Sequence, residues 1–389
     1  MSEQSFRALG VSAEVEQVLA ARNITNPFRI QSLVLADALA GSDVLAKAPT
    51  GSGKTLAFAL PIVERTTPGN SPAALVLVPT RELALQVTAE IALVAAPKRL
   101  RVATVYGGAP LGAQAKRAKT ANVVVATPGR LQDLLDRRMI SLDRVQILIL
   151  DEADRMLDMG FKPQVEKILR RMPRERQTML FSATLDGEVL QLAREYTQNA
   201  ARFEAELPKG SERGEVDHKF VSVTADAKVE ALVRELESDR DLALVFVRTK
   251  RGAERLVQKL KRHEIHAGAL HGDMTQGARE RALARFRSGS ITTLVATDVA
   301  ARGLDLDNIT HVINFDPPED DTAYVHRVGR TGRAGRSGSG VTFVLPEQQR
   351  DVSRVARMLG HTQQFEREGM RVAPARRVYT SRRGRRSRW

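Results

Sequence analysis

The sequence of 389 residues contains no cysteine, which excludes disulfide bonds and thiolate metal sites. Aromatic residues make up only 4% of the chain, and its single tryptophan is Trp389. No apolar run is long enough to cross a bilayer, and the first residues lack the basic segment and apolar core of a secretion signal. We therefore expect a cytoplasmic protein that folds without covalent cross-links.

Positive charge is abundant and unevenly distributed. The chain has a net charge of +14, and residues 371–389 hold eight arginines and no acidic residue. We expect residues 366–389 to form a disordered Arg-rich tail, which either keeps the chain soluble or tethers an anionic partner. Nucleic acid fits that partner better than a membrane does, because no amphipathic apolar face accompanies the charge.

Short apolar runs alternate with longer amphipathic segments, a pattern that predicts parallel sheets covered by helices. A polar stretch at 207–216 predicts a flexible linker, so we expect two α/β domains, at 1–206 and 217–365. The predicted strands are Asp43–Ala46, Leu75–Val78, Val102–Val105, Val123–Ala126, Ile147–Leu150, Thr178–Phe181, Phe220–Val223, Leu242–Val247, Ala267–Leu270, Thr293–Ala296, His311–Ile313 and Val341–Leu345. Helical patterns include Arg81–Val94, Gly129–Leu135 and Pro163–Arg170.

A glycine-rich turn, Gly51-Ser52-Gly53, separates the first predicted strand from a helical run. Glycines allow backbone N–H groups to close around phosphate oxygens, and the following helix adds its positive dipole. Lys54 would reach the β and γ phosphates, and Thr55 would bind Mg²⁺. Because Ala48 stands where this motif usually has its first glycine, an ordinary glycine-rich turn remains the alternative.

Two carboxylates follow the apolar strand that ends at Leu150. Asp151 would then lie near Mg²⁺, and Glu152 could act as a general base on an attacking water. The alternative is an acidic surface turn that caps the next helix. It is the weaker interpretation, because turns of that kind seldom follow such an apolar strand.

Further motifs follow in a fixed order, and with the two elements above they make the chain resemble DEAD-box RNA helicases from about residue 6 to 345. The motifs are Pro79-Thr80-Arg81-Glu82-Leu83, Gly107-Gly108, Thr127-Pro128-Gly129-Arg130, Asp151-Glu152-Ala153-Asp154, Ser182-Ala183-Thr184, Val245-Phe246-Val247-Arg248-Thr249, His271-Gly272, Ala296-Thr297-Asp298, Arg302-Gly303-Leu304-Asp305 and His326-Arg327-Val328-Gly329-Arg330-Thr331-Gly332-Arg333. Among bacterial members the chain is most similar to the compact RhlE-like branch.

The resemblance implies two RecA-like domains that close over ATP and RNA, so that ATP hydrolysis drives local, non-processive unwinding of short duplexes or RNA–protein remodelling. By position, the catalytic residues would be Lys54, Asp151, Glu152 and the arginine fingers Arg330 and Arg333. ATP would contact Phe6, Gln31, Pro49, Thr50, Gly51, Ser52, Gly53, Lys54, Thr55 and Asp305, and Mg²⁺ would contact Thr55 and Asp151. Coupling residues would be Asp154, Ser182, Thr184 and His326. RNA would contact Thr80, Arg81, Gly108, Thr127, Gly129, Arg130, Arg248, Thr249 and Thr297.

One position departs from the family pattern. Ile24 replaces the aromatic residue that usually stacks on adenine, so base preference would depend mainly on Gln31. The RNA candidates are hydroxyls, backbone N–H groups and cations, which bind phosphates and predict sequence-independent binding.

Two other functions remain open at this point: a DNA translocase with the same two-domain motor, and a non-catalytic RNA chaperone. The chaperone is disfavoured because Lys54, Glu152, Arg330 and Arg333 are all intact. We expect a monomer that acts with RNA-processing or ribosome-assembly proteins.

Overall fold

The computed structural model describes residues 5–49, 51–69, 71–185, 187–205, 215–238, 240–301, 306, 308–332 and 337–372. The chain forms two compact units, whose described parts run from 5 to 205 and from 215 to 372. Most of the predicted linker lies outside the described residues, and the first strand of the second unit begins at Val216, the last residue of that linker. The second unit also extends past residue 365, because its last helix ends at Arg367 and Met370 is buried. The tail from 373 onward lies outside the described residues.

The first unit contains a seven-stranded sheet in the order β3-β4-β2-β5-β6-β1-β7, and all its neighbouring strands pair in parallel. Strands β2, β4, β5 and β6 are buried along their whole length, which explains why they read as continuous apolar runs. The strands are β1 (Val44–Lys47), β2 (Ala74–Leu77), β3 (Val102–Val105), β4 (Val123–Ala126), β5 (Ile147–Asp151), β6 (Gln177–Ser182) and β7 (Ala201–Glu204).

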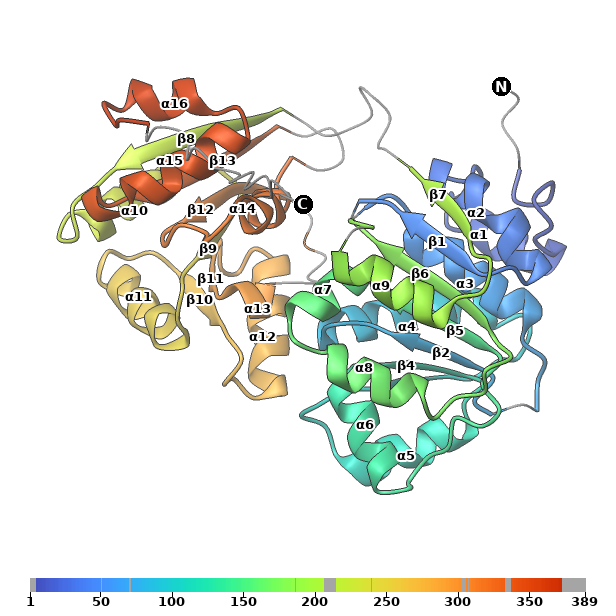
Figure 1. Ribbon diagram of the computed structural model, residues 1–389. Helices are drawn as coiled ribbons and strands as arrows, with labels where there is room; N and C mark the ends of the chain where they lie inside the picture. The colour runs from blue at the N-terminus through green and yellow to red at the C-terminus, as the bar shows by residue number, and fades with distance from the viewer. Residues whose placement is uncertain are drawn as a thin grey trace, which may run out of the picture. The chain divides into compact units, whose positions relative to one another are not determined.

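Helices cover both faces of this sheet (Figure 1). One apolar cluster joins the sheet to the helices α1 to α4, and a second joins its other face to α5 to α9. The helices are α1 (Ala13–Ala20), α2 (Arg29–Ala40), α3 (Lys54–Arg65), α4 (Arg81–Ala95), α5 (Leu111–Thr120), α6 (Pro128–Asp136), α7 (Ala153–Asp158), α8 (Lys162–Leu169) and α9 (Gly187–Tyr196).

The second unit contains a six-stranded parallel sheet in the order β10-β11-β9-β12-β13-β8. Its strands are β8 (Val216–Ser222), β9 (Leu242–Phe246), β10 (Ala267–Leu270), β11 (Thr293–Ala296), β12 (Ile309–Asn314) and β13 (Gly338–Val344). Its helices are α10 (Lys228–Glu237), α11 (Lys250–Arg262), α12 (Gln276–Arg287), α13 (Asp298–Ala301), α14 (Asp321–Val328), the 3₁₀ helix η1 (Pro346–Gln348), α15 (Gln349–Met358) and α16 (Thr362–Arg367). None of the helices in the described ranges is both long enough and apolar enough to span a membrane.

Two histidine rings stack where α16 packs on the edge strand β8. The rings of His218 and His361 lie 3.9 Å apart between centroids, and His218 Nδ1 lies 2.7 Å from the hydroxyl oxygen of Tyr324. Burial and, to a smaller extent, the neighbouring His361 lower the pKa of His218 to about 4, while Asp217 acts in the opposite direction. Burial also lowers the pKa of His361. Both rings are therefore neutral in the folded protein near pH 7.

This stack predicts a loss of stability in acid. A histidine whose pKa is lowered on folding binds its proton more readily when unfolded, so its contribution is complete above the unfolded pKa of 6.5 and is lost as the pH falls toward about 4. We expect the free energy of unfolding of the second unit to fall across this window. Replacing His361 with phenylalanine should reduce the slope, since it keeps a ring against His218 but removes one proton-binding group.

Urea unfolding of the full chain at a series of pH values, followed by circular dichroism, measures this slope. His263→Gln is the matched control, because His263 is exposed on the same unit. Equal slopes for the original chain and the His361→Phe variant would contradict the expectation.

Candidate nucleotide and RNA site

The residues that carry the predicted chemistry follow the carboxyl ends of neighbouring strands in the first unit. Lys47 at the end of β1 pairs in register with Ser182 at the end of β6, and Asp151 at the end of β5 pairs with Phe181. The N–H of Ala48 extends this pairing by donating to the carbonyl oxygen of Ser182, at 2.9 Å. Crevices at the carboxyl ends of parallel strands, where connections diverge, are where open α/β sheets bind ligands.

The phosphate loop has the backbone that a cradle requires. Gly51 and Gly53 have φ values of +83° and +86°, in the left-handed region where a side chain would be strained. Helix α3 begins at Lys54, directly after this turn, so its N–H groups and dipole point toward the loop. The Lys54 ammonium is buried and donates to the carbonyl oxygen of Ala48 at 2.9 Å. Thr50, which the sequence also assigns to this loop, lies outside the described residues.

Asp151 is buried at the tip of β5. Burial raises the pKa of its carboxyl to about 7, while the nearby Lys54 ammonium opposes this shift and the Glu152 carboxylate adds to it. A cation placed beside this carboxylate would favour its ionised form, because an opposite charge offsets the desolvation cost. Asp151 is thus suited to binding a positive ion or group.

Glu152 adopts a left-handed conformation with φ of +52°, which is costly for a residue with a side chain. Its carboxylate accepts a hydrogen bond from the guanidinium of Arg155, one helical turn later, and both side chains are buried. The Nε of Arg155 is buried and forms no hydrogen bond with a described residue. Arg155 is not among the site residues predicted from the sequence. The sequence did contain a signal for this pair, because Glu152 and Arg155 are three residues apart at the start of a helix.

Asp154 connects the turn after β5 to the turn after β6. One of its carboxylate oxygens accepts from the N–H groups of Ala183 and Thr184, at 3.0 and 3.1 Å. Its own N–H donates to Ser182 Oγ at 3.2 Å. The predicted coupling residues Asp154, Ser182 and Thr184 therefore form one hydrogen-bonded group, which would transmit a shift of either turn to the other.

Gln31 lies against the phosphate loop. Its Nε2 donates to the carbonyl oxygen of Gly53 at 2.9 Å, and its Oε1 accepts from the N–H of Phe28 at 2.8 Å. Phe6 is completely buried in the apolar cluster below, against which Ile24 also packs. Gln31 thus contacts the loop directly, whereas Phe6 and Ile24 pack in the apolar cluster that supports α2, the helix that contains Gln31.

The RNA candidates of the first unit gather around the turn after β3. A Cβ added at Gly108, whose φ is +93°, would lie 2.7 Å from the guanidinium of Arg81, so this turn requires glycine. Arg130 donates to the carbonyl oxygen of Ala109 at 2.8 Å. Thr80 caps α4 by accepting from the N–H of Leu83, and Thr127 precedes α6, in which Gly129 lies. Two arginines and two helix N-termini at one turn form a suitable surface for phosphates.

In the second unit, Arg248 and Thr249 are exposed after β9, and Thr249 caps α11 by accepting from the N–H of Gly252 at 3.0 Å. Thr297 is buried after β11. Arg330 donates to the carbonyl oxygen of His326 at 3.3 Å, within one turn at the end of α14. Asp305 and Arg333 lie outside the described residues.

Arg327, three residues before Arg330, is held by several contacts within its own unit. Its guanidinium forms a two-point ion pair with Asp298, at 2.6 and 2.7 Å, and also donates to Asn314 Oδ1 and to the carbonyl oxygen of Asp316. Arg327 is buried and lies 5.0 Å from the centre of the Phe246 ring. These contacts give it a structural role within its own unit.

The donor set fits magnesium bound together with phosphates. Within the ranges that the structure describes, no three histidine or acidic side chains gather into a metal cage. Mg²⁺ is usually held by one or two carboxylates together with waters and substrate phosphates, and not by a complete protein cage. Asp151 beside the phosphate loop and Thr55 in the first turn of α3 match this partial set.

Comparison with known proteins identifies the family. The DEAD/DEAH box helicase family model matches residues 28–192, and the helicase conserved C-terminal domain model matches residues 227–335. The chain is 41% identical over 360 residues to the DEAD-box ATP-dependent RNA helicase CshA of Geobacillus kaustophilus, covering 91% of this chain and 76% of that protein. It is 39% identical over 349 residues to CshA of Bacillus licheniformis, covering 89% and 71%.

The chain belongs to the DEAD-box family of ATP-dependent RNA helicases.

Solved structures agree with this assignment. The chain matches Saccharomyces cerevisiae Dbp5 bound to RNA and ADP BeF3 with a TM-score of 0.80 and 30% identity, over 94% of each chain. It matches Mss116p bound to ssRNA and AMP-PNP with a TM-score of 0.79 and 26% identity, over 92% of this chain and 78% of that one. The two RecA-like α/β domains and the ATP-dependent RNA helicase activity expected from the sequence are therefore confirmed.

The buried pair formed by Arg155 and Glu152 generates a stability prediction. Arg155→Met keeps the length of the side chain but leaves the Glu152 carboxylate buried without its partner. Breaking a buried ion pair in this way costs about 3–5 kcal/mol. We expect the variant to show a lower urea midpoint, with loss of hydrogen-exchange protection in peptides from β5 and α7.

Arg137→Met is the control, because Arg137 also pairs with an acidic residue on its own helical face, Asp133, but in an exposed position. It should leave the midpoint nearly unchanged, since exposed pairs contribute little. If the two variants lost equal stability, the contribution of the Arg155 pair to stability would not depend on its burial.

Proposed function

We propose that the turn after β1 binds the phosphates of ATP, with Mg²⁺ held between Thr55, Asp151 and the phosphates. The observation that carries this proposal is the adjacency of the phosphate loop, the buried Lys54 and the buried Asp151 at neighbouring strand ends. Pro49, Ser52 and Gln31 would complete the nucleotide contacts, and Thr50 and Asp305 are proposed for the same role from the sequence. Mg²⁺, when bound, would offset the negative charge that develops on the transferred phosphoryl group.

The protein's own groups would carry the remaining chemistry. Glu152 would accept a proton from the water that attacks the γ phosphorus, while the ADP oxygen leaves. The Lys54 ammonium would offset charge on the β and γ phosphates. Arg330 and Arg333 would add positive charge from the second unit, which would make hydrolysis depend on closure of the two units. Arginines in this role raise the rate by about 10³–10⁵.

RNA is bound by relatives of this chain, and we propose that its contacts here are mainly to the backbone. The turn that holds Arg81, Gly108 and Arg130 offers cations and N–H groups, as do Arg248 and Thr249 in the second unit. Phosphate contacts of this kind position a strand without reading its bases. Closure around a bent single strand would open short duplexes locally, and the group formed by Asp154, Ser182 and Thr184 would couple that closure to hydrolysis.

An RhlE-like branch, a cytoplasmic location, a monomeric state and RNA-processing or ribosome-assembly partners are suggested by sequence resemblance and composition. The relatives reported above are CshA proteins, so the RhlE-like branch has no support from them.

Glu152→Gln tests the assignment of the base. The amide keeps the shape of the side chain but cannot take a proton, so RNA-stimulated turnover should fall by about 10²–10⁴-fold while ATP and RNA still bind. Phosphate release and binding of a fluorescent ATP analogue would be measured on the full chain, with single-stranded RNA and DNA of the same sequence compared as activators.

Glu195→Gln is the matched control, because Glu195 is exposed on α9 of the same unit and should leave turnover unchanged. Full turnover in the Glu152→Gln variant would overturn the assignment. Equal activation by DNA would favour the translocase alternative.

A further inference from the structure

A basic pocket of about 750 Å³ lies on the first unit, away from the residues assigned to ATP and RNA. Its lining comes from four segments, each of which precedes a strand. Ser71 and Pro72 precede β2, Lys119 precedes β4, residues 138–144 precede β5, and Arg171 precedes β6. In a parallel sheet all of these segments lie at the edge where the strands begin, whereas the phosphate loop and Asp151 lie where strands end.

The two edges are well separated. The intervening strands are four to six residues long. At about 3.3 Å per residue they span about 13–20 Å, to which the loops add. An RNA segment held at the carboxyl edge therefore cannot also fill this pocket. A separate part of the same strand would have to reach it.

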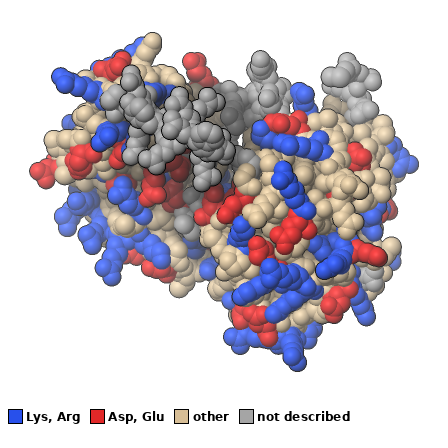
Figure 2. All heavy atoms as spheres, viewed as in Figure 1, with Lys and Arg blue, Asp and Glu red and all other residues tan. Residues whose placement is uncertain are grey.

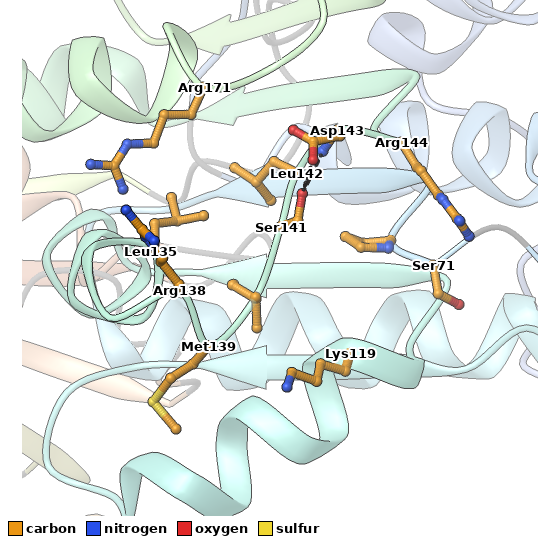
Figure 3. Close-up of a pocket in the computed structure, with 12 residues that line it drawn as sticks. Ser71, Lys119, Leu135, Arg138, Met139, Ser141, Leu142, Asp143, Arg144 and Arg171 are labelled. Carbon is orange, nitrogen blue, oxygen red and sulfur yellow. Dashed lines mark hydrogen bonds between the residues drawn. The ribbon is translucent and has the colours of Figure 1, made fainter.

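Among the described residues that line this pocket, four are cations, Lys119, Arg138, Arg144 and Arg171, and only Asp143 is acidic. Figure 3 shows Arg138 and Arg171 extending to the same side of the pocket, with Arg144 and Lys119 elsewhere around it. The Asp143 carboxylate accepts a hydrogen bond from Ser141 Oγ. The lining thus has a formal excess of three positive charges.

Most of this charge is not neutralised by the residues that the structure describes. Arg171 pairs with Asp136 at 2.6 Å, but the side chains of Lys119, Arg138 and Arg144 form no ion pair with another described residue. All three are exposed, so their charges are available to a ligand. In Figure 2, Lys and Arg side chains lie over the α5, α6 and α8 end of this unit, with Asp and Glu side chains among them. Like charges held together without acidic partners favour a polyanion.

Helix ends account for part of this arrangement. Lys119 lies in the last turn of α5, and Arg138 and Arg171 each come one residue after the C-cap of α6 and α8, where a cation interacts favourably with the helix dipole. Arg144 has no such explanation, because it lies in the loop that leads to β5. The pocket therefore contains more positive charge than the helix ends require.

We propose that this pocket is a second RNA-binding site, which takes the phosphate backbone of RNA that extends beyond the segment held at the carboxyl edge. Guanidinium groups pair with phosphate oxygens at two points, and an RNA strand presents its phosphates at regular spacing. None of the described lining residues is aromatic, so the pocket would hold the backbone without stacking bases. Because the enzyme already binds the same strand elsewhere, the flanking RNA is present at an effective concentration of millimolar order. A pocket with weak intrinsic affinity for RNA is then sufficient to hold the flanking segment.

An acidic protein segment is the competing occupant, since Leu135, Ile140 and Leu142 give the pocket an apolar floor. Such a segment would need several carboxylates at matching positions. RNA supplies consecutive charges on every strand and is the substrate of this enzyme. The observations therefore favour RNA.

The test combines two variants with two RNA lengths. Arg138→Glu with Arg144→Glu reverses two exposed charges of the pocket. Arg194→Glu with Arg202→Glu is the matched control, because both residues are exposed cations of the same unit outside the pocket. Binding of fluorescein-labelled oligouridine, about 8 or about 40 nucleotides long, would be measured by anisotropy on the full chain with a non-hydrolysable ATP analogue.

We expect the pocket variant to bind the long RNA roughly 10- to 30-fold more weakly at about 0.1 M salt. The slope of log affinity against log salt should decrease by about 1.4, or about 0.7 for each lost phosphate contact. Binding of the short RNA should stay unchanged, which shows that the fold and the principal RNA site are intact. The control variant should bind both RNAs as the original chain does.

Unchanged binding of the long RNA by the pocket variant would overturn the proposal and leave an acidic protein segment as the occupant to consider. An equal loss in the control variant would also overturn it, since the effect would then come from overall charge. Ultraviolet crosslinking of the long RNA carrying 4-thiouridine provides a direct check. Crosslinked peptides that contain residues 138–144 support the site, and their absence opposes it.

Discussion

The parallel alignment of the strands is the constraint on which the site depends. Because every neighbouring pair in the first sheet is parallel, the turns after β1, β5 and β6 meet at one edge, although they are separated by about a hundred residues in the chain. The phosphate loop, Asp151 and Ser182 therefore become neighbours through backbone hydrogen bonding alone. The side chains need only the correct position at the end of each strand.

Burial then determines the electrostatics of this edge. Lys54, Asp151, Glu152 and Arg155 are all buried, so their mutual interactions are much stronger than they would be in water. Burial raises the pKa of Asp151, and the neighbouring Glu152 and Asp154 carboxylates add to this shift. Arg155 satisfies Glu152 from within the same helical turn, and Asp154 is bound by the N–H groups after β6. Each carboxylate thus has a different set of partners, which allows three neighbouring acidic residues to serve different roles.

The sequence was sufficient for the parts of the fold in which burial is uniform. Strands covered on both faces are continuous apolar runs, and β4 and β11, which are buried along their whole length, have the bounds that these runs predict. The edge strand β7 escaped notice, because only one of its faces packs on the core and its sequence, Ala-Arg-Phe-Glu, alternates between apolar and charged residues. Sequence order revealed the phosphate loop and the acidic motif. It could not show that Arg327 is bound by Asp298 and Asn314, since that contact depends on how α14 docks on its sheet.

The amino edge of the first sheet illustrates a different limit. Its pocket is lined by four segments that are far apart in the chain, and no local pattern joins Lys119 to Arg144 or Arg171. The same parallel alignment that brings the phosphate loop and Asp151 to one edge brings these segments to the other. Helix C-termini also lie at this edge, and a cation near a helix C-terminus stabilises the helix. A protein that places cations at these helix ends therefore acquires a basic surface at the edge opposite the phosphate loop. The additional Arg144 would make that surface a site able to hold a second part of the same polyanion.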